Sequence, residues 1–353
     1  MEDRTKQKQA KIASFDPDGP GQVNAGIFGL PFTPFEADVV IIPVPWDVTV
    51  SNWEGTSKGP ANILEQSPQI DLYDETITDP WKAGIAMEQI DPTLEKLNKR
   101  LRNEAVKYIQ AKEQSSVNDN HELNRSLEEI NNACKELCEM VRKKSEKYLE
   151  EGKLAVVLGG DHSTPLGLIQ ALNRKHEEFG ILQIDAHADL RPAYLDFEYS
   201  HASVMYNASR LNGVKRIVQL GLRDICSQEA LLIKDDPEKF HPFYAREVRR
   251  REFEGETWQS VCSDIIDRLP DHVYISFDID GLDPSQCSST GTPVPGGLSY
   301  DAVLYLFDQL VKRGKTIIGF DLVETGSDPV DGIVACRILY KTIAMMLRSN
   351  GKA

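Results

Sequence analysis

Three short clusters of aspartate and histidine each follow directly after a run of apolar residues. The clusters are Asp161-His162-Ser163, Asp185-Ala186-His187-Ala188-Asp189 and Asp278-Ile279-Asp280-Gly281-Leu282-Asp283. The apolar runs before them cover residues 154–158, 181–184 and 273–277. Charged side chains beside buried strands are costly unless something compensates their charge. The pattern therefore predicts buried strands that end at a site holding compensating cations.

The rest of the chain alternates between strand-like and helix-like patterns. Further strand-like runs cover 39–42, 216–220 and 316–320, and helical patterns cover 165–175, 258–269 and 300–312. Near-continuous apolar strands that alternate with helices indicate a parallel sheet covered on both faces, so we predict an α/β, three-layer, doubly wound fold. Functional residues of such folds gather at the carboxyl ends of the strands, where all three clusters lie.

The chain is expected to contain one domain, over residues 37–353, preceded by an irregular N-terminal extension at residues 1–36, which is rich in Gly, Pro and Asp. A charged, helix-prone insertion is predicted at about residues 94–150, with a polar break at 115–120. Its second half carries one apolar stripe at steps of three to four residues. That stripe is too short for a coiled coil and favours a helix that packs on the body.

Composition narrows the expected location and partners. The formal net charge is −15, with 55 acidic against 40 basic residues, which argues against a nucleic-acid partner or an anionic membrane surface. No apolar stretch is long enough to span a bilayer, and the N-terminus is polar with no apolar signal core. The six cysteines are scattered without paired spacing, so we expect a cytoplasmic protein.

The three clusters together offer two imidazoles and four carboxylates as metal ligands: His162, Asp185, His187, Asp189, Asp278 and Asp280. Taken alone, His162 could be a histidine at a helix start, and residues 185–189 could be a polar loop. Carboxylates this close repel one another without a cation, however, and two ions that share bridging carboxylates would use all six residues. Oxygen-rich ligation without thiolate suits Mn²⁺, with Co²⁺ or Ni²⁺ as alternatives. Two adjacent ions can lower the pKa of a water that bridges them.

These residues resemble the ureohydrolase family, which comprises arginases, agmatinases, formiminoglutamases and guanidine hydrolases. The motifs GGDHS, DAHAD and SFDIDGLDPS occur in the family's order, and the resemblance covers roughly residues 38–345. It implies an arginase-like fold, two divalent metal ions, and attack of a metal-bridging hydroxide on a guanidinium carbon. The resemblance implies that one ion is held or bridged by His162, Asp185, Asp189 and Asp278. It implies that the other ion is held or bridged by His187, Asp185, Asp278 and Asp280. It also implies a homotrimer or homohexamer.

The resemblance assigns roles to two further residues. His201 stands where the family places a histidine that relays protons, and Glu324 stands where a carboxylate pairs with the substrate guanidinium. Without the resemblance, His201 would be interpreted as a loop histidine with a structural hydrogen bond. Glu324 would be interpreted as a solvated acid at a strand end. Asp185 is also assigned to the catalytic set.

Several loops depart from the family patterns. The Ser-Gly-Asn pattern that holds the α-groups of arginine is missing before His201, which argues against an arginase. Ser51-Asn52-Trp53 replaces Ser-Tyr-Arg, and Thr325-Gly326-Ser327 follows Glu324. Trp46, Thr49 and Trp53 are predicted to line the substrate pocket, where the two tryptophans add bulk. A small pocket suits guanidine or a compact, agmatine-like guanidino compound, and the chain resembles the agmatinase-like and guanidine-hydrolase branch.

Three alternatives remain open. A formiminoglutamase would release formamide and needs a positive pocket residue, for which Lys58, Arg191 and Arg210 are the candidates. A non-catalytic family subunit would normally have lost ligands, whereas all six are present. A hydrolase resembling histone deacetylases would use one zinc ion and lack the second set of ligands.

Overall fold

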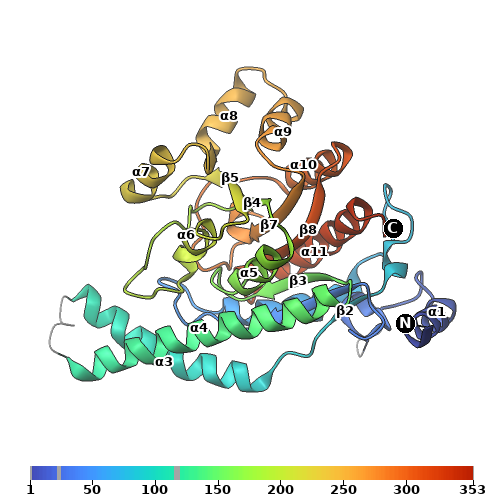
Figure 1. The fold of residues 1–353 in the computed structure, drawn as a ribbon, viewed down its shortest axis with the longest axis horizontal. Helices are drawn as coiled ribbons and strands as arrows, with labels where there is room; N and C mark the ends of the chain where they lie inside the picture. Colours follow the sequence, from blue (N-terminus) through green and yellow to red (C-terminus); the bar gives the residue numbers. More distant parts are fainter. Residues whose placement is uncertain (1, 22–24, 115–119, 353) are drawn as a thin grey trace.

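The computed structural model describes residues 2–21, 25–114 and 120–352 and contains one eight-stranded sheet (Figure 1). All strand pairings are parallel, in the order β2-β1-β3-β8-β7-β4-β5-β6. The strands are β1 (Val39–Val44), β2 (Ile85–Met87), β3 (Leu154–Gly159), β4 (Phe179–Ile184), β5 (Val214–Leu222), β6 (Phe240–Tyr244), β7 (His272–Asp278) and β8 (Thr316–Val323). Apart from the edge strand β6, which is mostly half-buried, the strands are largely buried on both faces, because helices cover the sheet on each side.

Helices flank both faces of the sheet, which confirms the predicted three-layer, doubly wound fold (Figure 1). One layer contains α4 (His121–Glu150), α5 (Leu166–Lys175) and α6 (Val204–Ser209). The other contains α2 (Gly59–Gln66), α9 (Trp258–Asp267), α10 (Tyr300–Lys312) and α11 (Pro329–Ser349). The helices α7 (Ser227–Asp235) and α8 (Ala245–Phe253) lie next to β6. No helix of the described residues is long and apolar enough to cross a membrane.

The N-terminal extension is not irregular throughout, which corrects the prediction for residues 1–36. Residues Glu2–Ser14 form helix α1. The prediction was wrong because the Gly and Pro residues of this region begin only at Pro17, and the thirteen helical residues before it contain neither. Arg4 and Lys8 anchor the helix to the carboxylate of Asp38 at 2.8 Å and 2.6 Å.

The charged region, which lies between β2 and β3 in the sequence, forms two helices, α3 (Pro92–Glu113) and α4. The two helices pack on each other. Most of the predicted apolar stripe of α4 is buried against α5 and the sheet, with Leu123 and Leu127 half-buried, as expected for a helix that packs on the body. Most of the predicted polar break, residues 115–119, lies outside the described residues, and Asn120 caps the start of α4. The short strands β2 and β6 were not predicted, because neither carries a long apolar run.

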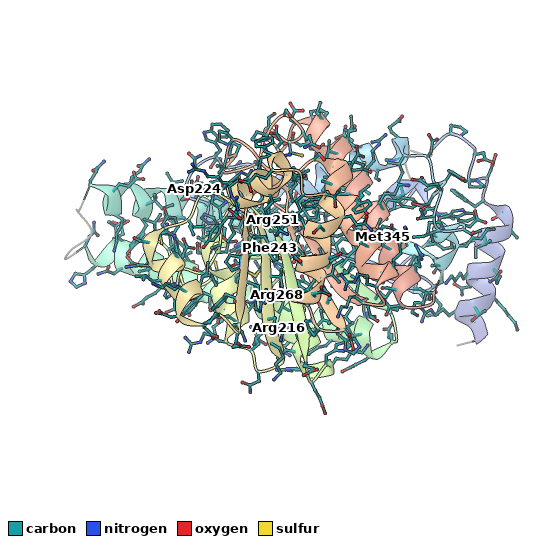
Figure 2. The ribbon with its side chains drawn as sticks, turned by 90° about the horizontal axis from the view of Figure 1, so that it is seen from above. Arg216, Asp224, Phe243, Arg251, Arg268 and Met345 are labelled. Carbon is teal, nitrogen blue, oxygen red and sulfur yellow. The ribbon has the colours of Figure 1, made fainter. Side chains whose placement is uncertain are left out.

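All strands run in the same direction, so their carboxyl ends meet at one edge of the sheet. In Figure 2, Asp224, just after the end of β5, lies above Arg216, which is near the start of the strand. Of the four central strands, β3, β8 and β4 end shortly before His162, Glu324 and Asp185, and β7 ends at Asp278. The three clusters and Glu324 therefore come from four adjacent strands.

Candidate metal centre and active site

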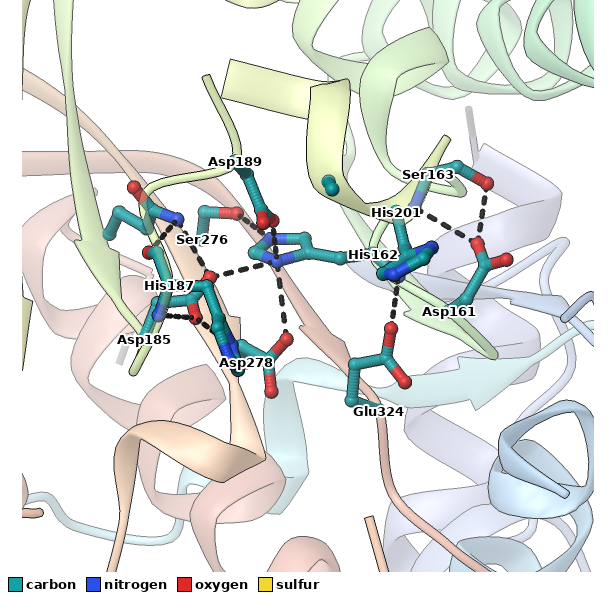
Figure 3. Close-up of polar contacts among 12 residues, drawn as sticks. Asp161, His162, Ser163, Asp185, His187, Asp189, His201, Ser276, Asp278 and Glu324 are labelled. Atoms are coloured by element: carbon teal, nitrogen blue, oxygen red, sulfur yellow. Dashed lines mark hydrogen bonds and ion pairs between the residues drawn. The ribbon is translucent and has the colours of Figure 1, made fainter. Parts of the chain in front are cut away.

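His162 lies at the centre of a group of buried carboxylates (Figure 3). Its Nδ1 atom lies 2.9 Å from Asp189 Oδ2, 3.0 Å from Asp185 Oδ2 and 3.3 Å from Asp278 Oδ2. The chain reaches this position by a close turn after β3. A Cβ atom on Gly160 would lie 2.1 Å from the carbonyl oxygen of Trp46, so only glycine fits there.

A second group of ligands lies next to the first. His187 Nδ1 is 3.0 Å from Asp280 Oδ2 and 3.6 Å from Asp185 Oδ1. Ligand atoms of His162, Asp185 and Asp278 lie within 4.8 Å of one another, and so do those of Asp185, His187 and Asp280. Asp185 belongs to both groups, one oxygen facing each histidine, which is the arrangement needed for a carboxylate that bridges two cations.

The chemistry of these groups fits divalent cations. The buried Nδ1 atom of His162 has no hydrogen-bond partner, although three carboxylates face it. Burial and the neighbouring Asp280 raise the pKa of Asp278 well above its usual range, and burial with Asp185 raises the pKa of Asp189 to about 7. Cations would remove this repulsion, so the described residues suit a pair of divalent metal ions.

Both histidines are held in their charged form when the carboxylates have no other partner. Burial opposes charge on His187, but Asp280 and Asp185 outweigh it and raise its pKa to about 12. Burial also opposes charge on His162, yet the close carboxylates of Asp185, Asp189 and Asp278 hold its pKa well above the usual value. A metal ion must therefore displace protons from these rings.

Polar residues inside the strands support the ligands from behind. His162 Nε2 lies 2.9 Å from Ser276 Oγ, and Ser276 and Tyr274 donate hydrogen bonds to Asp321 at 2.9 Å and 2.6 Å. Gln183 donates to Asp185 Oδ2 at 2.7 Å and accepts from Gln219. Sequence reasoning missed these residues. The signal available was the presence of polar side chains within strands that are otherwise largely apolar and buried.

Glu324 is buried beside the metal ligands rather than solvated. It follows β8 with a φ of +61°, and its Oε1 atom accepts a hydrogen bond from the backbone N–H of His162 at 2.9 Å (Figure 3). Burial, with Asp278 next in size, raises the pKa of Glu324 well above its usual range. A cation that pairs with this carboxylate would offset the cost of its burial.

His201 faces the same space from the loop before α6. Its backbone N–H donates to Thr49 Oγ1 at 3.4 Å, and its Nε2 atom lies 3.3 Å from Ser51 Oγ. Burial, followed by the charge of His187, lowers the pKa of His201 to about 3. The ring is therefore neutral at neutral pH, and its Nδ1 atom lies 3.4 Å from Ser200 Oγ.

A cavity of about 270 Å³ opens onto these groups. His162, His187, Asp189, His201, Asp278 and Glu324 line it together with residues that sequence reasoning did not assign to the pocket: Ser51, Tyr194, Asp224, Cys226, Glu229 and Thr292. Arg191 also lines it, packs 4.5 Å from the centre of the Tyr194 ring, and lies 3.9 Å from Glu229.

The predicted pocket roles of Trp46, Thr49 and Trp53 need correction. Trp46 is fully buried in the core, where its large apolar ring is most favourably placed, and it does not line the cavity. Thr49 is also fully buried and contacts Asp161 and His201 from behind. The Trp53 side chain is 56% exposed and lies outside the cavity lining.

Comparisons with known proteins show one family for this chain. The sequence profile of the arginase family matches residues 37–344. An N(1)-aminopropylagmatine ureohydrolase of Thermus thermophilus is 33% identical over 299 residues, which cover 84% of this chain and 86% of that protein. The crystal structure of the agmatine ureohydrolase of Thermoplasma volcanium superposes with a TM-score of 0.69 at 22% identity, over 98% of this chain and 99% of that one. A Trypanosoma cruzi formiminoglutamase with Mn²⁺ gives a TM-score of 0.64 at 19% identity, over 88% and 93%.

The chain belongs to the arginase family. It is therefore an enzyme that hydrolyses carbon–nitrogen bonds of amidines, as the ureohydrolase resemblance predicted.

Proposed function

We propose that this enzyme uses two divalent metal ions to release urea from guanidine or from a small guanidino amine of the agmatine type. The observation that carries the proposal is the convergence of six ligand residues with Glu324 at the carboxyl ends of β3, β4, β7 and β8. The relatives named as agmatine and aminopropylagmatine ureohydrolases support the substrate class.

His162, Asp189 and Asp278 would hold one ion, His187 and Asp280 the other, and Asp185 would serve both. Mn²⁺ suits this mixed oxygen and nitrogen set, with Ni²⁺ or Co²⁺ as alternatives. When bound, such ions supply an activated water for attack on the substrate carbon.

The protein residues bind the substrate and move its protons. The Glu324 carboxylate can accept two hydrogen bonds from a planar guanidinium, which offsets the cost of burying the acid. The neutral ring of His201 can take up a proton transiently, and its lowered pKa favours passing that proton on to the departing amine. The Ser51 hydroxyl, which lies 3.3 Å from His201 Nε2, can orient the ring for this transfer.

The cavity favours a small substrate without an acidic tail. Its volume of about 270 Å³ lies below the range of roughly 300–1,000 Å³ common for ligand pockets. Arg191 already contacts Glu229 and Tyr194. The Asp224 carboxylate is exposed at the lining and pairs with no cation among the described residues, so it can accept a substrate ammonium.

Formiminoglutamate hydrolysis is the second candidate, because Arg191 lies in the cavity and could bind a substrate carboxylate. The products separate the two reactions, since formiminoglutamate would give formamide. Lys58 and Arg210, the other candidates for this role, do not line the cavity.

The test is a substrate screen with protein loaded separately with Mn²⁺, Ni²⁺ or Co²⁺. The metal-loaded protein is incubated in turn with guanidine, agmatine, N(1)-aminopropylagmatine, guanidinobutyrate, arginine and formiminoglutamate. The release of urea and of formamide is measured. Asp185→Asn and Asp278→Asn should abolish urea release. Asp283→Asn is the matched control from the same cluster. Asp283 accepts a hydrogen bond from the backbone N–H of Ser285 and belongs to neither ligand group.

Metal analysis completes this test. Two equivalents per chain are expected, whereas one would favour the deacetylase-like alternative. Full activity of metal-free protein would refute the proposal, and a metal-loaded protein inactive on every amidine would favour the non-catalytic alternative.

A further inference from the structure

The loop at residues 47–57 is tied to helix α3 by a two-point contact. Asp47 donates its backbone N–H to Asn98 Oδ1 at 2.8 Å, and Asn98 Nδ2 donates to Asp47 Oδ1 at 2.8 Å. The other carboxylate oxygen of Asp47 accepts hydrogen bonds from the N–H groups of Gly55 and Ser57 at 2.9 Å and 3.2 Å. Asn98 thus fixes Asp47, the residue whose side chain links the start of the loop to its end.

Arg102, one turn further along α3, holds the middle of the same loop. Its Nη1 atom donates to the carbonyl oxygens of Val50 and Val48 at 2.6 Å and 3.2 Å, and its Nε atom donates to Glu54 at 3.3 Å. The Arg102 residue is buried, so these bonds compensate a charge removed from water. The two carbonyl groups flank Thr49, which fixes the direction of its side chain.

The residues fixed in this way contact His201. Thr49 Oγ1 accepts the backbone N–H of His201, and Ser51 Oγ lies 3.3 Å from its Nε2 atom. Thr49 and Ser51 lie on either side of Val50, whose carbonyl oxygen binds Arg102. A continuous set of contacts therefore runs from α3 to the imidazole.

The helical pair also holds the segment that leads into His201 from the other side. Tyr108 on α3 donates to the Asp196 carboxylate at 2.6 Å. Asn131 on α4 donates to the Asp196 carbonyl oxygen at 3.1 Å and accepts the N–H of Glu198 at 3.0 Å. Asp196 has a φ of +63°, so these contacts stabilise a turn that non-glycine residues seldom adopt.

We propose that Asn98 and Arg102 are positioning residues that fix the position of the His201 side chain through the loop at residues 47–57. The α3–α4 pair is the scaffold that holds this loop and the segment 196–201, which leads into His201. The inference rests on the proposed role of His201 in proton transfer. It gives the charged helical region a function in catalysis, although the helices themselves do not line the cavity.

The first experiment compares Arg102→Met with Arg100→Met in the full-length, metal-loaded protein. Arg100 is on the same helix and pairs with Glu129 of α4 at 2.7 Å, but both residues of this pair are exposed, and no contact of Arg100 with the loop is seen among the described residues. We expect Arg102→Met to lower kcat by about 10- to 100-fold with little change in KM, because small displacements of a catalytic group have effects of this size. Arg100→Met should stay within about twofold of wild type.

A double-mutant cycle tests whether Arg102 acts through His201. If it does, adding Arg102→Met to His201→Asn should cause no further loss of kcat. An equal further loss in both backgrounds would overturn the proposal, and so would unchanged kcat in the single variant. Loss of metal in proportion to activity would also overturn it, because it would show a general structural defect.

A readout independent of activity separates this inference from the proposed function. Amide hydrogen exchange should become faster at residues 47–57 and 200–203 in Arg102→Met but not in Arg100→Met. Unchanged exchange would contradict the scaffold, whereas inactivity of the wild type on every substrate would contradict only the proposed function. If Arg102→Met does not fold, Arg102→Lys is tested instead, because it keeps the positive charge and should lose less kcat. Wild-type kcat in both Arg102→Lys and Asn98→Ser would overturn the proposal.

Discussion

The Nε2 atom of His162 lies 2.9 Å from the hydroxyl oxygen of Ser276, on the side of the ring opposite the ligand carboxylates. Ser276 in turn donates to the buried carboxylate of Asp321. A hydrogen bond at one ring nitrogen fixes the orientation of the imidazole and determines which nitrogen is free to bind a metal ion. Ser276 thus helps to aim the Nδ1 atom of His162 at the site.

Replacement of Ser276 by alanine should weaken metal binding without removing a ligand. We expect the affinity of the weaker ion to fall by about 10- to 100-fold, as is typical when the support of a metal-binding histidine is lost. Metal titration of the apoprotein measures this change. Ser263→Ala is the control, because that hydroxyl is exposed and bonds only to its own helix. Equal affinities in both variants would show that Ser276 does not orient the ring.

Metal uptake should release protons. The carboxylates hold the pKa of His162 well above its ordinary value and raise that of His187 to about 12, whereas both rings must be neutral at the nitrogen that binds a metal. Metal affinity should therefore weaken as the pH falls. Calorimetric titration in buffers with different ionisation enthalpies counts the protons released. Binding without proton release would contradict this description of the metal-free site.

Glu324→Gln should separate substrate binding from metal binding. The amide can still accept the hydrogen bond from the N–H of His162, but it lacks the charge that pairs with a guanidinium. We expect two metal ions to remain and kcat/KM to fall by about 100-fold, or roughly 3 kcal/mol, the cost of an unpaired charge in a closed site. Steady-state kinetics with metal analysis would check both parts. Wild-type kcat/KM in this variant would exclude Glu324 as the guanidinium partner.

His176, remote from the cavity lining, should make stability depend on pH. Burial, and next the neighbouring His272 ring at 5.0 Å, lower its pKa to about 4. In the unfolded chain the His176 ring binds a proton near pH 6.5, whereas in the folded chain it stays neutral down to about pH 4. The free energy of unfolding therefore falls as the pH drops below about 6.5. Between pH 7 and pH 5, His176→Gln should lose about 1 kcal/mol less stability than the wild type, since solvent screening at this half-buried site weakens the effect. Urea unfolding at both pH values measures the difference between the two proteins, and equal losses would contradict the assignment.

The sequence by itself determined the central strands and the metal-ligand types. Apolar runs before residues 161, 185 and 278 marked β3, β4 and β7, because burial on both faces requires such runs. The spacing of Asp185 and His187 was also a local property. The family motifs added His201 and Glu324, which the structure places at the same cavity.

Only the tertiary structure decided what surrounds these groups. The order β3-β8-β7-β4 brings Glu324 to the backbone of His162 across 162 positions of sequence, and no local pattern encodes that order. The direction in which a loop turns likewise depends on distant contacts, such as those of Arg102 with Val48 and Val50. Trp46 was therefore assigned wrongly to the pocket, and Arg191 could not be placed in it. Local periodicity reports burial along one strand or helix, whereas the lining of a site depends on packing between segments far apart in the chain.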